Sequence, residues 1–246
     1  MLRFIIIILY VIVFLILSIP LMLVEWIIGK FNMDLRNRSS LFIINKAFSV
    51  VRFLAGTKVI VLGMENIPTD TAVLYVGNHR SFFDIVIPYT LFTRPTGFVA
   101  KQEMTKVPLL SIWMMFVNCL FLDRKNIKKG MKTILNAIEN VKSGISMVIF
   151  PEGTRNKTAD SFLPFHAGSF KIAEKGGVPI IPMTMVNTAD IFEDHLPKVK
   201  KTTVVIEFGK PVYIDELPAE QKKFLSNTVK GIIEETYFKL QKEYFS

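Results

Sequence analysis

Residues 146–155 read SMVIFPEGTR, an apolar run followed at once by a proline, a glycine and two charged residues. A short apolar run bounded by turn residues is typical of a buried strand, here Ser146–Phe150. After it, Gly153 permits a tight turn, and Arg155 offers a planar donor fork suited to a phosphate. Glu152 can brace that arginine or bind a substrate hydroxyl. A plain surface turn with an exposed arginine is the alternative interpretation.

On both sides of this segment, from Lys58 onward, short apolar runs alternate with helical patterns. Strands are expected at Val59–Leu62, Ala72–Val76, Phe98–Ala100, Cys119–Leu122, Ser146–Phe150, Ile180–Met183 and Thr203–Phe208. Helices are expected at Phe82–Leu91, Leu109–Val117, Ile127–Lys142, Gly168–Glu174 and from Pro218 to about Tyr244. The clearest helix has apolar residues at steps of three and four: Ile127, Met131, Ile134, Leu135, Ile138 and Val141. The alternation predicts an α/β fold, with a mixed sheet flanked by helices.

A second polar cluster, Asn78 through Asp84, follows the expected strand Ala72–Val76. Ser81 can cap a helix that begins near Phe82, which leaves His79 in the preceding loop. Asp84 then lies in the first helical turn, where its carboxylate can accept a hydrogen bond from the imidazole and leave the other ring nitrogen free as a base. The alternative is a capping box formed by Ser81 and Asp84 alone.

Two more strand ends carry charged side chains, Asp123-Arg124 after one strand and Lys101 at the end of another. A structural ion pair is the simpler alternative for Asp123-Arg124, and the same caution applies to Lys101-Gln102-Glu103. In an open α/β sheet, however, the ends of strands line the ligand crevice. A base beside the cations Lys101, Arg124 and Arg155 suits a phosphorylated alcohol. The remaining histidines, His166 and His195, are expected to be non-catalytic.

The N-terminus is the most apolar part of the chain. No charged residue occurs from Phe4 to Val24, a run of 21 that reaches the ~20 residues a helix needs to cross a bilayer. A cleaved signal peptide is the alternative, but its apolar region is shorter and ends at small residues. The segment Leu41–Leu54 is expected to be an amphipathic helix at the membrane interface or a helix packed on the catalytic domain. We therefore expect a membrane anchor at 1–54 and a catalytic domain at 55–246.

Charge and composition narrow the choice of partner. A formal net charge of +9 fits nucleic acid or an anionic membrane surface, and the apolar N-terminus favours the membrane. Basic residues after the apolar run (Lys30, Arg36, Arg38) outnumber Arg3 before it, which predicts a catalytic domain on the cytoplasmic face. The single cysteine, Cys119, has apolar neighbours and is expected to be a buried residue and not a nucleophile.

Four motifs in order resemble the 1-acyl-sn-glycerol-3-phosphate acyltransferase family, over about Lys58 to Val212. They are Asn78-His79-Arg80-Ser81 through Asp84, Phe121-Leu122-Asp123-Arg124, Phe150-Pro151-Glu152-Gly153-Thr154-Arg155 and Val178-Pro179-Ile180-Ile181-Pro182.

The resemblance implies that His79 is the general base and Asp84 its orienting partner. It implies that Glu152, Gly153, Thr154 and Arg155 form the glycerol-phosphate site, with Arg124 and Lys101 adding positive charge. The implied acceptor is lysophosphatidate, and the implied co-substrate is an acyl-CoA or acyl carrier protein thioester, without metal or other cofactor. Membrane lipids are the expected surroundings, and nucleic acid is not an expected partner.

The mechanism expected from these residues is direct transfer. His79 removes the proton from the acceptor hydroxyl, which attacks the thioester carbonyl. Backbone amides around residues 79–84 are candidates for stabilising the resulting oxyanion. Acylation of glycerol 3-phosphate or of another lysophospholipid is the nearest alternative. A non-catalytic protein that binds anionic lipid is the alternative from another class.

Overall fold

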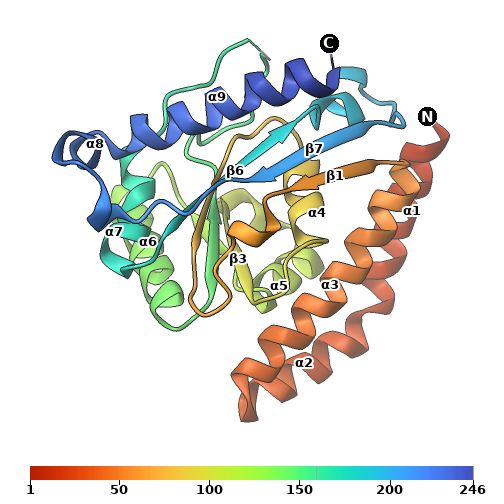
Figure 1. Ribbon diagram of the computed structural model, residues 1–246. Coiled ribbons are helices and arrows are strands. Elements are labelled where there is room, and N and C mark those ends of the chain that lie inside the picture. Colours follow the sequence, from red (N-terminus) through yellow and green to blue (C-terminus); the bar gives the residue numbers. More distant parts are fainter. Residues whose placement is uncertain (159, 246) are drawn as a thin grey trace.

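The computed structural model describes residues 1–158 and 160–245, which form a seven-stranded sheet between two helical layers (Figure 1). The strand order is β1-β7-β6-β2-β5-β3-β4. Strands β6, β2, β5, β3 and β4 are parallel to one another, whereas β7 is antiparallel to β6 and parallel to β1. The predicted mixed α/β sheet is therefore confirmed.

All seven predicted strands are present, with small shifts at their ends. They are β1 (Lys58–Leu62), β2 (Leu74–Gly77), β3 (Thr96–Lys101), β4 (Leu120–Leu122), β5 (Ser146–Ile149), β6 (Ile180–Val186) and β7 (Thr203–Phe208). The α-helices are α1 (Leu2–Leu17), α2 (Ile19–Phe31), α3 (Met33–Ala55), α4 (Phe83–Tyr89), α5 (Pro108–Phe116), α6 (Ile127–Lys142), α7 (Lys171–Gly176), α8 (Ala219–Lys223) and α9 (Leu225–Phe245). The expected C-terminal helix is thus divided at Phe224, and the expected helix Gly168–Glu174 is a 3-10 turn followed by α7.

The core lies on both faces of the sheet, because the central strands are covered on both sides. Along β2 every residue is buried, and alternate side chains point to opposite faces. Tyr75 belongs to the apolar cluster under α1–α5, whereas Leu74 and Val76 belong to the cluster under α6, α7 and α9. The two helical layers therefore each have their own core, separated by the sheet.

The N-terminal apolar run is not one helix, contrary to the expectation for Phe4–Val24. It breaks at Ser18 into α1 and α2, which meet at 51°. Pro20 in the first turn of α2 explains the break, because proline lacks the N–H group that would bond to the carbonyl of Ile16. Trp113 of α5 donates its Nε1–H to Ser18 Oγ at 2.8 Å, which ties the break to α5.

By length and composition, no single helix in the described part of the chain is long and apolar enough to cross a bilayer. The bent pair α1 and α2 meets the criterion only when the two helices are taken together.

Helix α3 packs on the fold that contains the sheet, which agrees with one of the two expectations for Leu41–Leu54, that of a packed helix. It starts earlier than expected, at Met33, because the Asn32 side chain caps it by accepting a hydrogen bond from the Leu35 amide. Its buried residues Leu41, Ile44 and Val51 belong to the same cluster as β2 and α4.

Buried Glu25 joins α2 to α3. Its carboxylate accepts hydrogen bonds from Ser39 Oγ at 2.8 Å and from Ser40 Oγ at 2.9 Å. These contacts hold α2 and α3 together.

Candidate active site

The predicted site residues gather at one edge of the sheet. His79 follows β2, Glu152 follows β5, Lys101 ends β3 and Arg124 follows β4. These four strands are neighbours and run parallel, so their carboxyl ends meet at the same edge. The sequence argument that these residues lie at the ends of neighbouring strands thus agrees with the topology.

His79 and Asp84 are in direct contact, with Nδ1 of His79 2.8 Å from Oδ2 of Asp84. The same carboxylate oxygen accepts the amides of Arg80 at 2.6 Å and Ser81 at 2.7 Å. The Ser81 hydroxyl in turn accepts the amide of Phe83, the first residue of α4. The predicted contact between His79 and Asp84 is therefore present, and the same buried carboxylate accepts the Ser81 amide. The capping box is only half formed, because the amide of Asp84 donates to the Ser81 carbonyl oxygen and not to its hydroxyl.

The imidazole of His79 is fixed in orientation. Its ring stacks on Phe150 with centroids 4.3 Å apart and planes inclined by 10°. Because Nδ1 faces the Asp84 carboxylate, the neutral ring carries its proton on Nδ1 and leaves Nε2 as the acceptor. The side chain is 15% exposed, so it can be reached from solvent.

Glu152 holds the backbone of the histidine loop. Its Oε1 accepts the His79 amide at 2.9 Å, and its Oε2 accepts the Leu163 amide at 3.2 Å. Burial raises the pKa of the Glu152 carboxyl above its usual value, although the two amide hydrogen bonds and His79 oppose that shift. Contact with Arg155 was one of the two roles considered for Glu152. The carboxylate that contacts this arginine belongs to another residue.

That residue is Glu193, in the 3-10 turn Glu193–His195 that follows β6. Its Oε1 accepts a hydrogen bond from Arg155 Nη1 at 3.0 Å and from the Phe82 amide at 2.8 Å. Its Oε2 accepts the Ser81 hydroxyl at 2.6 Å. The guanidinium of Arg155 also lies 4.0 Å over the Phe82 ring. Glu193 thus joins the loop of His79 and Asp84 to Arg155.

The turn after β5 depends on Gly153, whose φ of +74° lies in the left-handed region that glycine adopts at low cost. A Cβ atom at Gly153 would lie 3.5 Å from Arg124 Nη1 and 3.4 Å from His166 Nε2. Arg124 therefore lies beside this turn, and burial lowers the pKa of its guanidinium while Glu103 opposes the shift. His166 lies closer to the site than its sequence context indicated.

Thr154 and Lys101 are at the same edge but less closely held. Both are exposed, and across the described residues no hydrogen bond or ion pair joins either side chain to His79 or Arg155.

Two residues that were expected to be non-catalytic have partners or surroundings of their own. His195 pairs with Asp190, at 2.6 Å from Nε2 to Oδ1. Cys119 is buried, and burial raises the pKa of its thiol, in agreement with a packing residue.

The backbone amides of the histidine loop are already used, contrary to the expectation that they stabilise an oxyanion. The amide of His79 donates to Glu152, those of Arg80 and Ser81 to Asp84, and that of Phe82 to Glu193. The amides of Phe83 and Asp84 donate to Ser81. These hydrogen bonds fix the conformation of the loop, so its amides are directed at protein acceptors and not at a bound thioester.

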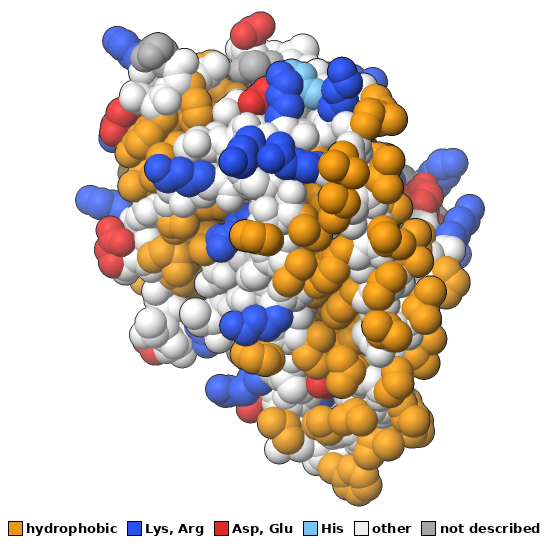
Figure 2. All heavy atoms as spheres, turned by 90° about the vertical axis from the view of Figure 1, so that its right-hand side faces the viewer, with side chains coloured by type: hydrophobic (Ala, Val, Ile, Leu, Met, Phe, Trp, Pro, Cys, Tyr) orange, Lys and Arg blue, Asp and Glu red, His pale blue; other side chains and the backbone are white. Residues whose placement is uncertain are grey.

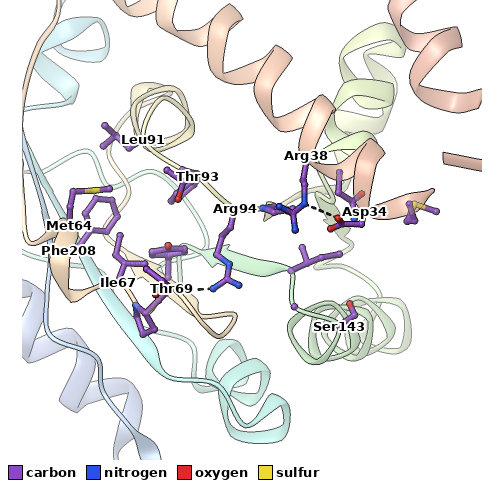
Figure 3. Close-up of a pocket in the computed structure, with 18 residues that line it drawn as sticks. Asp34, Arg38, Met64, Ile67, Thr69, Leu91, Thr93, Arg94, Ser143 and Phe208 are labelled. Carbon is purple, nitrogen blue, oxygen red and sulfur yellow. Dashed lines mark hydrogen bonds and ion pairs between the residues drawn. The ribbon is translucent and has the colours of Figure 1, made fainter. Parts of the chain in front are cut away.

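A cavity of about 690 Å³ lies at the opposite edge of the sheet (Figure 3). Its lining includes Arg94 and Ser143, which precede β3 and β5, and Phe208 at the end of β7. The Arg94 guanidinium donates to the carbonyl oxygens of Pro68 and Thr71. None of the predicted site residues lines this cavity, so we place the candidate active site at the carboxyl edge, where the titratable side chains meet.

Comparisons with known proteins identify the family of the chain. Residues 58–186 match the family model described as Acyltransferase. The chain is 31% identical over 196 residues to the 1-acyl-sn-glycerol-3-phosphate acyltransferase of Borreliella burgdorferi, covering 80% of this chain and 78% of that one. It is 29% identical to the enzyme of the same name from Escherichia coli, over 72% of this chain and 73% of the relative.

The fold is also similar to a solved structure, that of the 1-acyl-sn-glycerophosphate acyltransferase from Thermotoga maritima. The TM-score is 0.64 at 24% sequence identity, and the match covers 92% of this chain and 98% of the other. At this identity the likeness supports the fold alone.

Proposed function

Since the chain belongs to the acyltransferase family, we propose that it acylates the sn-2 hydroxyl of 1-acyl-sn-glycerol 3-phosphate to make phosphatidate. The observation that carries the proposal is the contact between His79 and buried Asp84 at the edge of the sheet where Arg124 and Arg155 also lie. Relatives that carry the name of this reaction support the choice of acceptor.

In the proposed reaction, Nε2 of His79 accepts the proton of the acceptor hydroxyl as that oxygen attacks the carbonyl carbon of an acyl thioester. The Asp84 carboxylate stabilises the imidazolium through Nδ1–H. The tetrahedral intermediate then expels the thiolate, which takes the proton from His79. General-base assistance of this kind contributes about 10²–10⁴ in rate.

Binding of the acceptor phosphate is proposed for Arg155 and Arg124. The Arg155 side chain is 38% exposed, and its Nη1 contacts Glu193, so the rest of its donor fork remains open to an anion. Gly153 keeps the turn free of a side chain between Arg124 and His166. Holding the phosphate places the sn-2 hydroxyl near His79, a positioning effect that can exceed that of the base itself. Lys101 and Thr154 are proposed to contribute at the rim.

Membrane attachment is proposed for the N-terminal helices. Large apolar side chains such as Leu9, Ile16, Leu23 and Phe31 point outward from α1 and α2. Figure 2 shows a continuous apolar surface at this end of the molecule, bordered by Lys and Arg side chains. Exposed apolar surface of this extent is typical of a membrane or protein contact. Cytoplasmic orientation remains a prediction from the basic residues that follow the apolar run.

The proposed function is tested with purified protein and a panel of three acceptors: lysophosphatidate, glycerol 3-phosphate and lysophosphatidylcholine. We expect transfer to lysophosphatidate to have the highest kcat/KM. His79→Ala should lose transfer by about 10²–10⁴-fold while still binding lysophosphatidate. Near-normal turnover by His79→Ala would remove this residue from the mechanism. A preference for another acceptor in the panel would replace lysophosphatidate, and transfer to none of them would favour a lipid-binding protein.

A further inference from the structure

Helix α6 exposes large apolar side chains that a helix at the surface normally buries. Ile127 is 81% exposed, Met131 61% and Leu135 55%, although all three lie in the apolar pattern that predicted this helix. The buried part of α6 is formed instead by Thr133, Ala137, Ile138 and Val141. The helix is therefore covered toward its C-terminal end and along one side, and a second apolar stripe faces outward.

The same stretch is strongly basic. Between residues 124 and 135 the sequence has no Asp or Glu, and Lys125, Lys128, Lys129 and Lys132 are all exposed. We call Ile127, Met131 and Leu135 together with these four lysines the α6 patch. An apolar stripe flanked by cations is complementary to an apolar surface flanked by carboxylates.

The α6 patch lies next to the candidate active site. Its first residue, Lys125, directly follows Arg124, whose guanidinium is near Gly153. Thr133 Oγ1 of α6 donates to the carbonyl oxygen of Phe121 in β4 at 3.0 Å, so the first turns of the helix pack on the strand end. A molecule bound to the α6 patch is therefore beside the entrance to the catalytic edge.

The α6 patch and helices α1–α3 lie in different helical layers, on opposite faces of the sheet. The core of α6 is the cluster formed with α7 and α9, on the face of the sheet opposite to the cluster of α1–α5. Figure 1 shows α6 and the N-terminal helices on different sides of the sheet. A bilayer that contacts the apolar surface of α1 and α2 lies on the other side, so a soluble partner fits the α6 patch better than the same membrane.

We propose that the α6 patch binds an acidic carrier protein that delivers the acyl group as a thioester. The inference rests on the proposed function, which requires an acyl thioester but does not identify what carries it. Four lysines around three apolar side chains fit a small, transient interface, in which charge steers the encounter and apolar contacts fix the register. Such an interface suits a donor that must leave after each transfer.

The test compares two donors of the same acyl chain, an acyl carrier protein thioester and an acyl-CoA, with lysophosphatidate as acceptor and the full-length chain in vesicles. The charge variant is Lys128→Glu/Lys132→Glu, and the apolar variant is Ile127→Ser/Met131→Ser. The matched control is Lys210→Glu/Lys239→Glu, which changes the net charge equally at exposed positions away from α6.

Both α6 variants should lower kcat/KM for the carrier-linked donor by about tenfold or more, and for acyl-CoA by less than about twofold. The control should change neither value by more than about twofold. Equal losses with both donors, loss of vesicle binding by the α6 variants, or no change with either donor would each overturn the proposal. If the wild type uses acyl-CoA but not the carrier, only this inference fails. If it uses neither donor, the proposed function fails.

Discussion

Removing the carboxylate of Glu193 is the sharpest test of how the two halves of the site are held together. Glu193→Ala deletes three acceptor contacts, to the Ser81 hydroxyl, the Phe82 amide and Arg155. Hydrogen bonds to a charged group contribute about 1.5–3 kcal/mol each when they are buried. The contact with Arg155 is discounted to about 0–1 kcal/mol, because that side chain is 38% exposed. The contact with the Phe82 amide is discounted to about 0.5–1 kcal/mol, because Phe82 is exposed. The three contacts together give an expected stability loss of about 2–5 kcal/mol.

Glu193→Gln keeps the shape and separates structure from charge. Its amide oxygen can still accept from Phe82 and Arg155, and its NH₂ group can donate to the Ser81 hydroxyl. We expect a stability loss of about 1 kcal/mol, measured by urea unfolding. Because Arg155 loses its charged partner, KM for the phosphorylated acceptor should change more than kcat. For Glu193→Ala, kcat/KM should fall by about 10–100-fold, or 1.4–2.7 kcal/mol.

The assay is steady-state transfer to lysophosphatidate, with Asp194→Asn as the control. Asp194 is the exposed next residue of the same turn, so its substitution removes one charge from the same place. Adding Glu193→Gln to Arg155→Ala should have little further effect on KM, because both substitutions act on one contact. Fully additive effects, or a folded Glu193→Ala protein with wild-type kcat and KM, would refute the reasoning.

Two further predictions concern the turn after β5. Gly153→Ala should lower the free energy of unfolding by about 1–2 kcal/mol because φ is +74°, while Gly168→Ala, where a Cβ meets open space, should change it by less than about 0.5 kcal/mol in the same urea titration. Burial raises the pKa of Glu152, so its folded form favours the proton, and its contribution to stability is largest below the ordinary pKa and falls as the pH rises through the raised value. The unfolding free energy of the wild type relative to Glu152→Gln should therefore fall as the pH rises above the ordinary carboxyl pKa, and an increase would contradict the assignment.

Local patterns were sufficient to predict most of the fold. The strand positions follow from short apolar runs between turn residues, and α6 has the predicted bounds Ile127–Lys142 because its periodicity and its Asn126 cap are local signals. The contact between His79 and Asp84 was also predictable, since both lie within one loop and helix turn.

The features that were missed depend on contacts between distant segments. Glu193 is 112 residues from Ser81, and nothing in its own neighbourhood indicates that it accepts from Ser81, Phe82 and Arg155. Met131 and Leu135 are exposed, whereas Ile138 and Val141 of the same apolar pattern are buried, because periodicity does not record which side of a helix other elements cover. The break at Ser18 did have a local signal, Pro20, but hydropathy alone does not register a bend.

The first turn of α1 touches the loop that carries Glu193. Phe4 stacks on Phe192 with ring centroids 5.3 Å apart, and Phe192 directly precedes Glu193. If α1 lies in a bilayer, as proposed, any change in lipid packing that tilts this helix also displaces Phe192 and, through its neighbour, the guanidinium of Arg155. Affinity for the acceptor would then vary with the thickness and fluidity of the membrane, and the enzyme would respond to the physical state of the lipid that it helps to build.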